Sequence, residues 1–321
     1  MSEHVALTPI REIYSSAAQD DDVSHTHAVE EFLEHIYAVD RELRWNERFE
    51  PGVAEPCYRG ARQAGAFIFD FGDIRSLLAN WGYVQSAMSI NDPNRLLLEY
   101  TQAMMGFLLF NASPSTIEII GLGGGSLAKY CHTYLPTTRI RAVEIDEDVL
   151  AMAHQFCIPV DSSRLELILA DGHDFVAQDE KTTDILLIDD FNIDEEVHQL
   201  RSAEFFSACR VRLNPGGILV ANLCDPRGQD QSALRNLRAC FDHIVTVPVE
   251  AGMNLVVLAF PDGRQQSDLR QLSDTANLLE NSHPLPMAEL VERLQLQTGQ
   301  LVSKTASETE PSTLGSQRCW S

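Results

Sequence analysis

The chain has 321 residues, of which 44% are hydrophobic and 22% charged, as is typical of a globular protein with a full hydrophobic core. Its 47 acidic residues against 24 basic ones give a net charge of −23. Such a surface repels a phosphate backbone, so we expect no nucleic-acid partner, whereas an acidic cleft would attract a cationic small molecule.

The cysteines and the N-terminal residues indicate the compartment. The seven cysteines form no CxxC pair, and several lie in apolar helix or strand patterns, which is typical of free thiols in a reducing compartment. Residues 1–22 show no basic region followed by an apolar one. No apolar stretch approaches the ~20 residues of a membrane span. We therefore expect a cytoplasmic protein that does not contact a membrane.

The first 110 residues are expected to form an arm and a small subdomain. Residues 1–45 are an acidic arm in which apolar spacing predicts one helix. Residues 46–110 contain short β-rich runs broken at Gly72-Asp73, which predict β-hairpins, and then a linking helix. Asp92 is the expected N-cap of that helix.

From residue 115 the apolar runs alternate between strand-like and helix-like segments. This alternation predicts a parallel sheet with helices on both faces, and two final strands add an antiparallel hairpin. The expected strands are Ile117–Ile120, Ile140–Ile145, Leu165–Ala170, Ile185–Asp189, Ile218–Leu223, His243–Val249 and Asn254–Phe260. The expected helices are Ser126–Tyr134, Glu147–Phe156, Ala203–Leu213 and Ala233–Phe241. We assign residues 111–262 to this domain, and residues 263–321 to one amphipathic helix with a disordered tail.

A glycine-rich turn, GLGGGS, follows the first of these strands. Gly121 and Gly123 fit the GxGxxG fingerprint of a dinucleotide-binding turn, but Ser126 occupies the third glycine position. The acidic residue expected about 20 positions further on is present as Glu144. The turn by itself leaves a dinucleotide and a nucleoside without phosphate both open.

Carboxylates at three successive strand ends favour the nucleoside. Glu144 can accept hydrogen bonds from both ribose hydroxyls. Asp171 follows the third strand, where it would meet an adenine amino group, and Gly172 lets the base approach the backbone. Asp189 ends the fourth strand, beside the first, where ligands bind in open α/β sheets.

Together these features resemble the class I methyltransferase fold, which binds S-adenosylmethionine or a relative. It is a Rossmann-like α/β fold with a mostly parallel seven-stranded sheet and an antiparallel C-terminal hairpin. Within it, residues 67–260 resemble the spermidine synthase (polyamine aminopropyltransferase) family, including a small β-hairpin subdomain before the main domain. The matching segments are GYVQS, EYTQAM, GLGGGSLAKY, VEIDEDVLAMA, ADGHDF, ILLIDDFN and EFFSACRVRLNPGGILVANL.

The resemblance implies a role for each matching residue. The residues implied at the adenosyl donor are Gly121, Gly123, Gly125, Glu144, Ile145, Asp171 and Gly172. Those implied at the acceptor are Gln85, Tyr100 and Asn192. Asp189 stands where the family has its catalytic base. An alkyl amine has a pKa of about 10.4, so a carboxylate within hydrogen-bond reach can orient the ammonium and take its proton.

Three positions depart from the family's pattern. The family's turn reads GGGDGG, and its aspartate, which holds the amino end of the aminopropyl donor, is Gly124 here. The second carboxylate of the family's D-[ST]-[ST]-D loop is Asn192, and the usual Tyr-Pro pair of the last hairpin turn is absent. Gly124 would repel the carboxylate of intact S-adenosylmethionine less than an aspartate would. Decarboxylated and intact S-adenosylmethionine both remain open as donor, as do aminopropyl and methyl transfer to an amine or polyamine.

The altered positions also leave a second function open, that of a homologue without turnover that binds an adenosyl ligand for regulation. A dehydrogenase is less favoured because the carboxylates at the three strand ends favour a nucleoside without pyrophosphate, and no serine has the GxSxG context of a hydrolase. The N-terminal histidines form no zinc motif with cysteine, so no metal is expected. Family analogy implies a homodimer.

Overall fold

The structure is a computed structural model that describes residues 66–80, 83–178, 182–189, 199–224, 232–249, 254–261 and 269–298. The helix predicted for the N-terminal arm, the C-terminal tail and Asn192 fall outside these residues, as does the last hairpin turn, residues 250–253, between the two final predicted strands. Among the residues described, no helix is both long and apolar enough to cross a bilayer.

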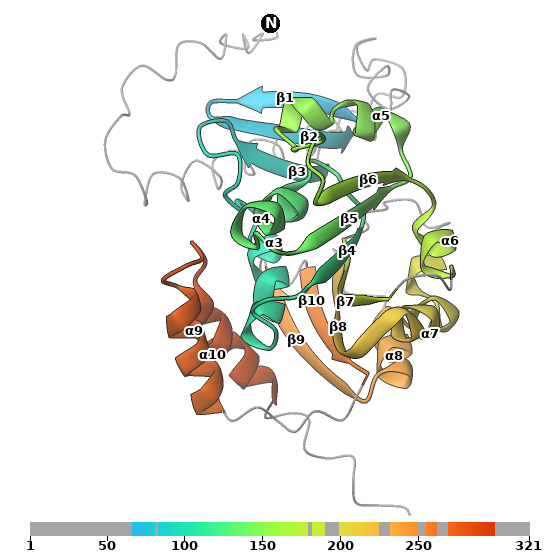
Figure 1. The fold of residues 1–321 in the computed structure, drawn as a ribbon, viewed down its shortest axis with the longest axis vertical. Helices are drawn as coiled ribbons and strands as arrows, with labels where there is room; N and C mark the ends of the chain where they lie inside the picture. Colours follow the sequence, from blue (N-terminus) through green and yellow to red (C-terminus); the bar gives the residue numbers. More distant parts are fainter. Residues whose placement is uncertain are drawn as a thin grey trace, which may run out of the picture.

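A small antiparallel sheet stands at one end of the molecule, at the top of Figure 1. Its strands, in the order β1-β2-β3, are β1 (Phe67–Phe71), β2 (Ile74–Asn80) and β3 (Tyr83–Ser89). Gly72 turns the first hairpin with φ of +58°, a left-handed conformation that glycine adopts without steric cost. The predicted hairpin sheet before the main domain is confirmed.

The main sheet has seven strands in the order β6-β5-β4-β7-β8-β10-β9. The parallel strands are β4 (Thr116–Ile120), β5 (Arg139–Glu144), β6 (Leu165–Leu169), β7 (Thr183–Ile188) and β8 (Leu213–Cys224). The antiparallel strands are β9 (His243–Val249) and β10 (Asn254–Phe260). Strands β5 and β6 lie on one side of β4, and β7 and β8 lie on the other. The strand order therefore reverses at β4, and this switch point is where such sheets bind ligands. The predicted fold class is confirmed.

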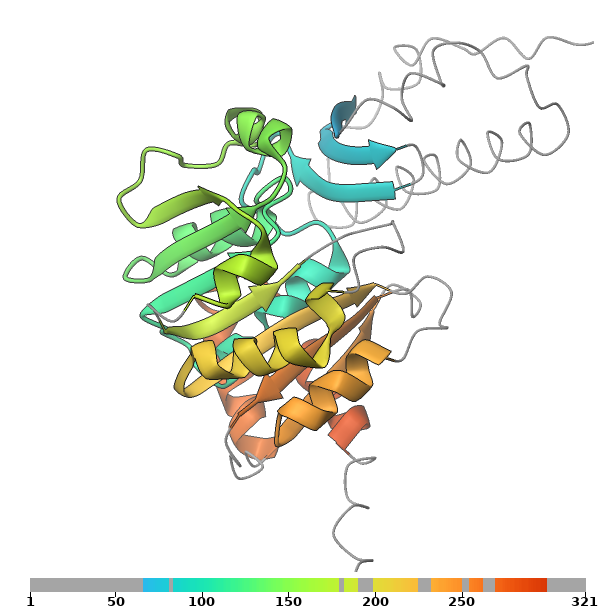
Figure 2. The ribbon, with the colours of Figure 1, turned by 90° about the vertical axis from the view of Figure 1, so that its right-hand side faces the viewer.

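Helices cover both faces of the main sheet, and Figure 2 looks onto the face that carries α7 and α8. This face holds α6 (Gly172–Val176), α7 (Ala203–Arg212) and α8 (Ser232–Cys240). The opposite face holds α3 (Glu99–Met104), α4 (Ser126–Tyr134), α5 (Glu147–Ala151), α9 (Leu269–Leu279) and α10 (Met287–Thr298). The 3-10 turns are η2 (Met105–Leu109), η3 (Ala153–Phe156) and η4 (Gln199–Arg201). Because strand side chains alternate, Ile119 and Ile120 of β4 enter the two separate hydrophobic clusters.

Two helix predictions are wrong. Asp92 is not an N-cap: it forms a separate turn in which its carbonyl accepts from Arg95 N at 3.1 Å, and α3 begins only after Leu98. Helix α9 was not predicted, because its sequence is largely polar. Its buried side chains are the short series Leu272, Ala276 and Leu279. The stretch Asn214–Gly217, predicted to lie between helix and strand, belongs to β8.

A buried charge network joins the main sheet to α6 and α7. Glu118, in the middle of β4, is 1% exposed and receives hydrogen bonds from both Arg141 and Arg212. Arg212 donates from Nε to the Glu118 carboxylate at 2.5 Å, and from Nη1 to the Phe175 and Gln178 carbonyls at 2.9 and 2.8 Å. The guanidinium of Arg212 also lies 4.3 Å from the centroid of the Phe175 ring. Burial lowers the pKa of Arg212, but its carboxylate partner and the carbonyls compensate the buried cation.

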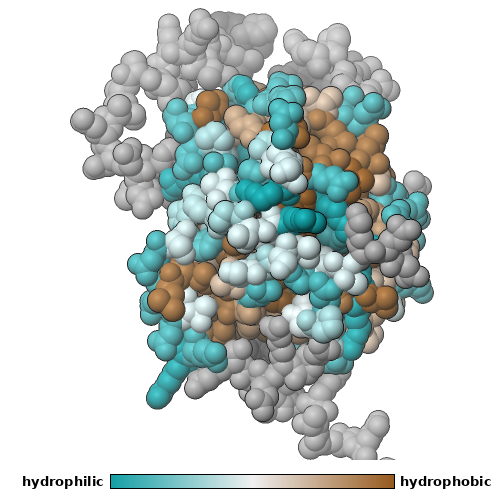
Figure 3. All heavy atoms as spheres, in the orientation of Figure 1, coloured by the Kyte–Doolittle hydropathy of each residue, from teal (hydrophilic) through white to brown (hydrophobic). Residues whose placement is uncertain are grey.

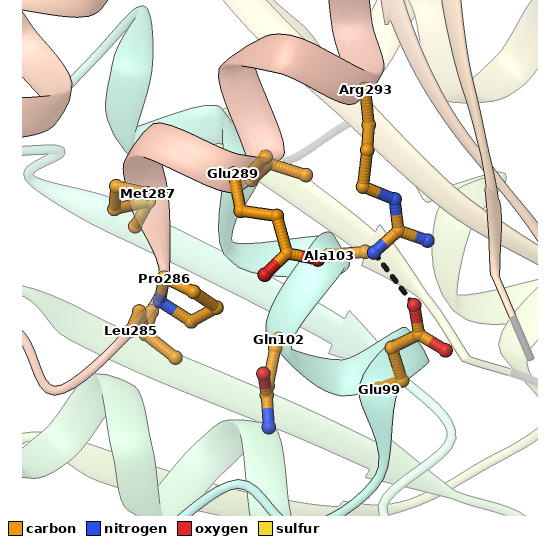
Figure 4. Close-up of a pocket in the computed structure, with 9 residues that line it drawn as sticks. Glu99, Gln102, Ala103, Leu285, Pro286, Met287, Glu289 and Arg293 are labelled. Carbon is orange, nitrogen blue, oxygen red and sulfur yellow. Dashed lines mark ion pairs between the residues drawn. The ribbon is translucent and has the colours of Figure 1, made fainter.

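The C-terminal helix α10 packs against α3. A pocket of about 150 Å³ lies between α3 and α10. Figure 4 shows Glu99 and Arg293 pointing toward one another at one side of it. Arg293 forms an ion pair with Glu99 at 2.6 Å and donates to the Pro248 carbonyl of β9 at 2.6 Å. Helix α10 therefore links α3, which carries Tyr100, to the edge of the main sheet.

Candidate active site

The candidate site lies at the carboxyl ends of the parallel strands, next to the small sheet. The glycine turn, residues 121–125, connects β4 directly to α4. Gly121, Gly123 and Gly125 have φ values of +92°, +50° and +68°, which favour glycine over any other residue. Gly125 is the N-cap of α4, and because glycine has no side chain it makes no capping hydrogen bond to the first amides of this helix.

Glu144, at the end of β5, is held by four backbone amides. Its Oε2 accepts from Leu122 N and Gly123 N at 3.1 and 3.2 Å. Its Oε1 accepts from Ile145 N and Asp146 N at 2.9 and 3.1 Å. A carboxylate offers about four lone-pair sites, so these amides occupy them all. A ribose diol bound here would have to displace some of these bonds.

Asp171, after β6, caps a helix. Its Oδ1 accepts from His173 N at 2.7 Å, and this bond makes it the N-cap of α6. Gly172 is required for close packing, because a Cβ there would lie 2.4 Å from Ile120 Cγ2 of β4. The structure thus gives both residues a local structural role at the position where we expect the adenine.

An apolar surface accompanies these groups. Ile145, directly after Glu144, is 67% exposed, and Leu169 at the end of β6 is 53% exposed. Figure 3 shows hydrophobic atoms gathered over the part of the molecule where α5 and β6 lie in Figure 1. Exposed large aliphatic side chains beside polar groups are typical of a surface that packs against an apolar ligand such as a base.

The carboxylate expected to be the base lies between two hydrogen-bond donors. Asp189, which follows β7 and is half-buried, accepts from Tyr100 Oη at 3.4 Å through Oδ2 and from Asn222 Nδ2 at 3.1 Å through Oδ1. The main chain holds it as well, since Asp189 N donates to the Ile120 carbonyl at 2.8 Å. The structure therefore brings Tyr100 and Asp189 together, although 89 residues separate them.

Asn222 was missed in the sequence. It is 7% exposed and its Oδ1 has no hydrogen-bond partner within the described structure. The sequence signal for Asn222 was a polar amide within the apolar run of β8. Because the ends of neighbouring parallel strands meet at one edge of the sheet, this amide could have been placed near Asp189. Because Asn222 Nδ2 donates to Asp189, the buried Oδ1 of the same amide is an acceptor beside the expected base for which the described residues offer no donor.

Strand β3 packs on the glycine turn. The carbonyl of Gln85 lies 3.9 Å from the position of a Cβ built on Gly123, and Gln85 Oε1 is buried without a hydrogen-bond partner in the described part of the chain. Ser86 is 6% exposed, and its hydroxyl lies 3.2 Å from the Ser126 hydroxyl at the start of α4. A Cβ built on Gly124 would lie 2.7 Å from Ser86 Oγ and 2.9 Å from Phe156 Cδ1.

We expect Gly124→Ala to lower the free energy of unfolding by ~1–3 kcal/mol, because the added methyl overpacks two buried side chains. Urea denaturation measures the loss. Ser86→Gly removes one of the two side chains that the new methyl would meet. The variant with both substitutions should therefore lose less free energy of unfolding than the sum of the two single losses. Additive effects would show that Ser86 does not crowd Gly124.

The remaining polar groups near the turn are structural. Lys129 of α4 is 1% exposed, donates from Nζ to the Phe156 carbonyl at 2.8 Å, and has its pKa lowered to about 8 by burial. Phe156 is thereby held beside Gly124. Among the described residues, no three His, Cys, Asp or Glu side chains converge as metal ligands would.

Comparisons with known proteins agree with this geometry. The family described as "Spermine/spermidine synthase domain" matches residues 97–250. A protein of Neisseria meningitidis serogroup A named polyamine aminopropyltransferase is 35% identical over 243 residues, which are 75% of this chain and 92% of that protein.

Two solved structures show the same fold. The crystal structure of human methyltransferase-like protein 13 in complex with SAH has a TM-score of 0.53 and 26% identity, and covers 57% of this chain and 91% of that one. A probable spermidine synthase from Corynebacterium glutamicum has a TM-score of 0.57 and 19% identity, and covers 78% of this chain and 95% of that one.

Proposed function

This chain belongs to the spermine/spermidine synthase family, and we propose that it transfers a group from an S-adenosylmethionine-type donor to an amine, with Asp189 as the base. It is a spermidine synthase-like transferase, of the aminopropyl or methyl kind. No observation on the described residues favours the alternative of a regulatory homologue without turnover. The observation that carries the proposal is the position of Asp189 between Tyr100 and Asn222, at the strand edge that carries Glu144 and Asp171.

The chemistry requires an unprotonated amine. An alkyl amine with a pKa of about 10.4 enters as an ammonium, and Asp189 accepts its proton. The freed nitrogen lone pair attacks the carbon bonded to the sulfonium, a C–N bond forms, and the electrons of the broken C–S bond return to the sulfur as a neutral thioether. Asn222 Oδ1, which has no hydrogen-bond partner among the described residues, and the Tyr100 hydroxyl would provide further polar contacts for orienting the ammonium.

The adenosyl part would bind at the ends of β5 and β6. The ribose hydroxyls would replace some of the amides that now bond to Glu144, so donor binding would also free N–H groups of the glycine turn. The exposed Ile145 would pack on the adenine, while Asp171 would accept from its amino group. We retain Gly172 beside the base as a proposal from the resemblance alone. Gln85 would line the acceptor side from β3, and we retain Asn192 there as a proposal from the resemblance alone.

Binding measurements test the nucleoside assignment. Calorimetric titration of the full chain with methylthioadenosine, S-adenosylmethionine and NAD should show binding of the first two. Binding of NAD alone would overturn the assignment of the glycine turn to a nucleoside without pyrophosphate.

We expect Asp171→Asn to weaken adenosyl binding by about tenfold while stability is nearly unchanged. Asn retains an oxygen for the N-cap, but its amide presents hydrogens instead of a charged acceptor to the adenine. Titration with methylthioadenosine and thermal unfolding measure the two effects. Ser202→Ala is the control: it removes the N-cap of α7, whose hydroxyl accepts from Phe205 N at 3.0 Å, and should lower stability without changing affinity. Equal affinities for Asp171→Asn and the unaltered chain would remove Asp171 from the base-binding site.

Three further assignments are proposals from the family and the sequence. They are a homodimer, a cytoplasmic location, and domain limits at residues 45, 110 and 262. Light scattering after size-exclusion chromatography would test the first.

A further inference from the structure

The surroundings of Gly124 leave no room for an acidic side chain. Ser86 and Phe156 are 6% and 1% exposed, and both lie within 3 Å of the position that a Cβ on Gly124 would take. Phe156 is held in place through its carbonyl, which accepts from the buried Lys129. The turn is therefore built around a residue without a side chain.

The atoms nearest to this point belong to the Ser86 side chain and the Phe156 ring, and the amides of the turn bond a carboxylate, Glu144. The Ser86 and Ser126 hydroxyls lie 3.2 Å apart above the turn. The turn amides Leu122 N and Gly123 N already hold one carboxylate oxygen, Glu144 Oε2, at 3.1 and 3.2 Å. The nine-residue helix α4 begins here without a capping side chain, so its positive end faces the turn. The turn amides and the start of α4 donate hydrogen bonds to an anion, whereas the Ser86 and Ser126 hydroxyls beside Gly124 carry no charge that would hold an isolated ammonium.

We propose that the donor carries an α-amino acid tail, as intact S-adenosylmethionine does, and that Ser86 determines this preference by occupying the space beside Gly124. The proposal rests on the proposed function, because it assumes that the sulfonium tail lies along the glycine turn. The tail of S-adenosylmethionine contains a carboxylate and an ammonium, whereas the decarboxylated donor ends in an ammonium alone. Amides released when a ribose displaces them from Glu144 become available for the tail carboxylate.

The test compares two donors that differ by one carboxylate. Calorimetric titration of the full chain should show S-adenosylmethionine binding at least about tenfold more tightly than its decarboxylated form. Methylthioadenosine, which has no such tail, reports the nucleoside part alone. If methylthioadenosine binds and the decarboxylated donor binds as tightly as the intact one or more tightly, the inference is overturned and the proposed function stands. If methylthioadenosine does not bind, the proposed function fails and the inference fails with it.

Two variants of equal size test the role of Ser86. Ser86→Asp places a carboxylate beside the turn and should reverse the preference toward the decarboxylated donor by at least about tenfold, whereas Ser86→Asn should retain the preference for the intact donor. If Ser86→Asp does not fold, as judged by circular dichroism, Ser126→Asp and Ser126→Asn make the same comparison at the half-buried neighbour. A folded aspartate variant with an unchanged ratio of affinities would overturn the assignment of this position to the donor tail.

Discussion

Replacing Asp189 by Asn is expected to lower kcat by roughly 10²–10⁴-fold, while the affinity for methylthioadenosine stays within about threefold. Asn has the size of Asp and an oxygen that can still accept from Asn222 Nδ2, which lies 3.1 Å away. It cannot take a proton from an ammonium, so the amine nucleophile would not form. Steady-state kinetics and calorimetry on the same preparation separate the loss of chemistry from a loss of binding.

Asp184→Asn is the matched control for this experiment. Asp184 is another carboxylate on β7, near its other end, where Oδ2 accepts from Ser115 N and Thr116 N at 2.8 and 3.1 Å. The same substitution there removes charge from the same strand without touching the strand edge that carries the site, so we expect kcat to stay within about threefold. Comparable kcat values for the two variants would show that Asp189 is not the base.

Replacing Arg212 by Met is expected to lower the free energy of unfolding by about 3–5 kcal/mol. The variant leaves Glu118 buried with one guanidinium partner in place of two, and removes the guanidinium donor from the Phe175 and Gln178 carbonyls, of which that of Phe175 still accepts from Gln178 N at 3.3 Å. For a chain of this size the melting temperature should fall by roughly 10 °C. Urea denaturation at pH 7 measures the change in free energy directly.

An exposed pair of similar geometry provides the comparison. Arg75 donates to both oxygens of Asp70 at 2.8 and 2.7 Å, but the two side chains are 27% and 44% exposed. We expect Arg75→Met to cost only about 0–1 kcal/mol, because water and salt screen such a pair. A similar cost at Arg75 and Arg212 would contradict the view that burial makes the Glu118 network important for stability.

The sequence predicted the framework of the main domain well, because its strands are short buried apolar runs separated by clear turns. Helix α4 and strands β9 and β10 have the predicted bounds. The errors have separate causes. The buried residues of α9, Leu272, Ala276 and Leu279, have helical spacing, but the segment is polar overall and was not assigned to a helix, whereas α6 has only five residues, too few for a period of 3.6 to be visible.

The candidate site was predictable in part. The sequence alone shows which carboxylates follow successive strands, so Glu144, Asp171 and Asp189 could be placed at a common edge of the sheet. The groups that distant segments bring to the site could not be predicted: Asn222 of the neighbouring strand β8 bonds to Asp189, and Ser86 of the small sheet lies beside Ser126 at the glycine turn. The four amides around Glu144 depend on the backbone conformation of the turn, which the glycines permit but do not specify.

The most direct test of the transferase assignment is product analysis by mass spectrometry after incubation with putrescine and either intact or decarboxylated S-adenosylmethionine. We predict a putrescine product that carries the transferred group, together with an equal amount of the adenosyl thioether, and no product with Asp189→Asn. Binding of methylthioadenosine without transfer from either donor to putrescine or spermidine would contradict the assignment.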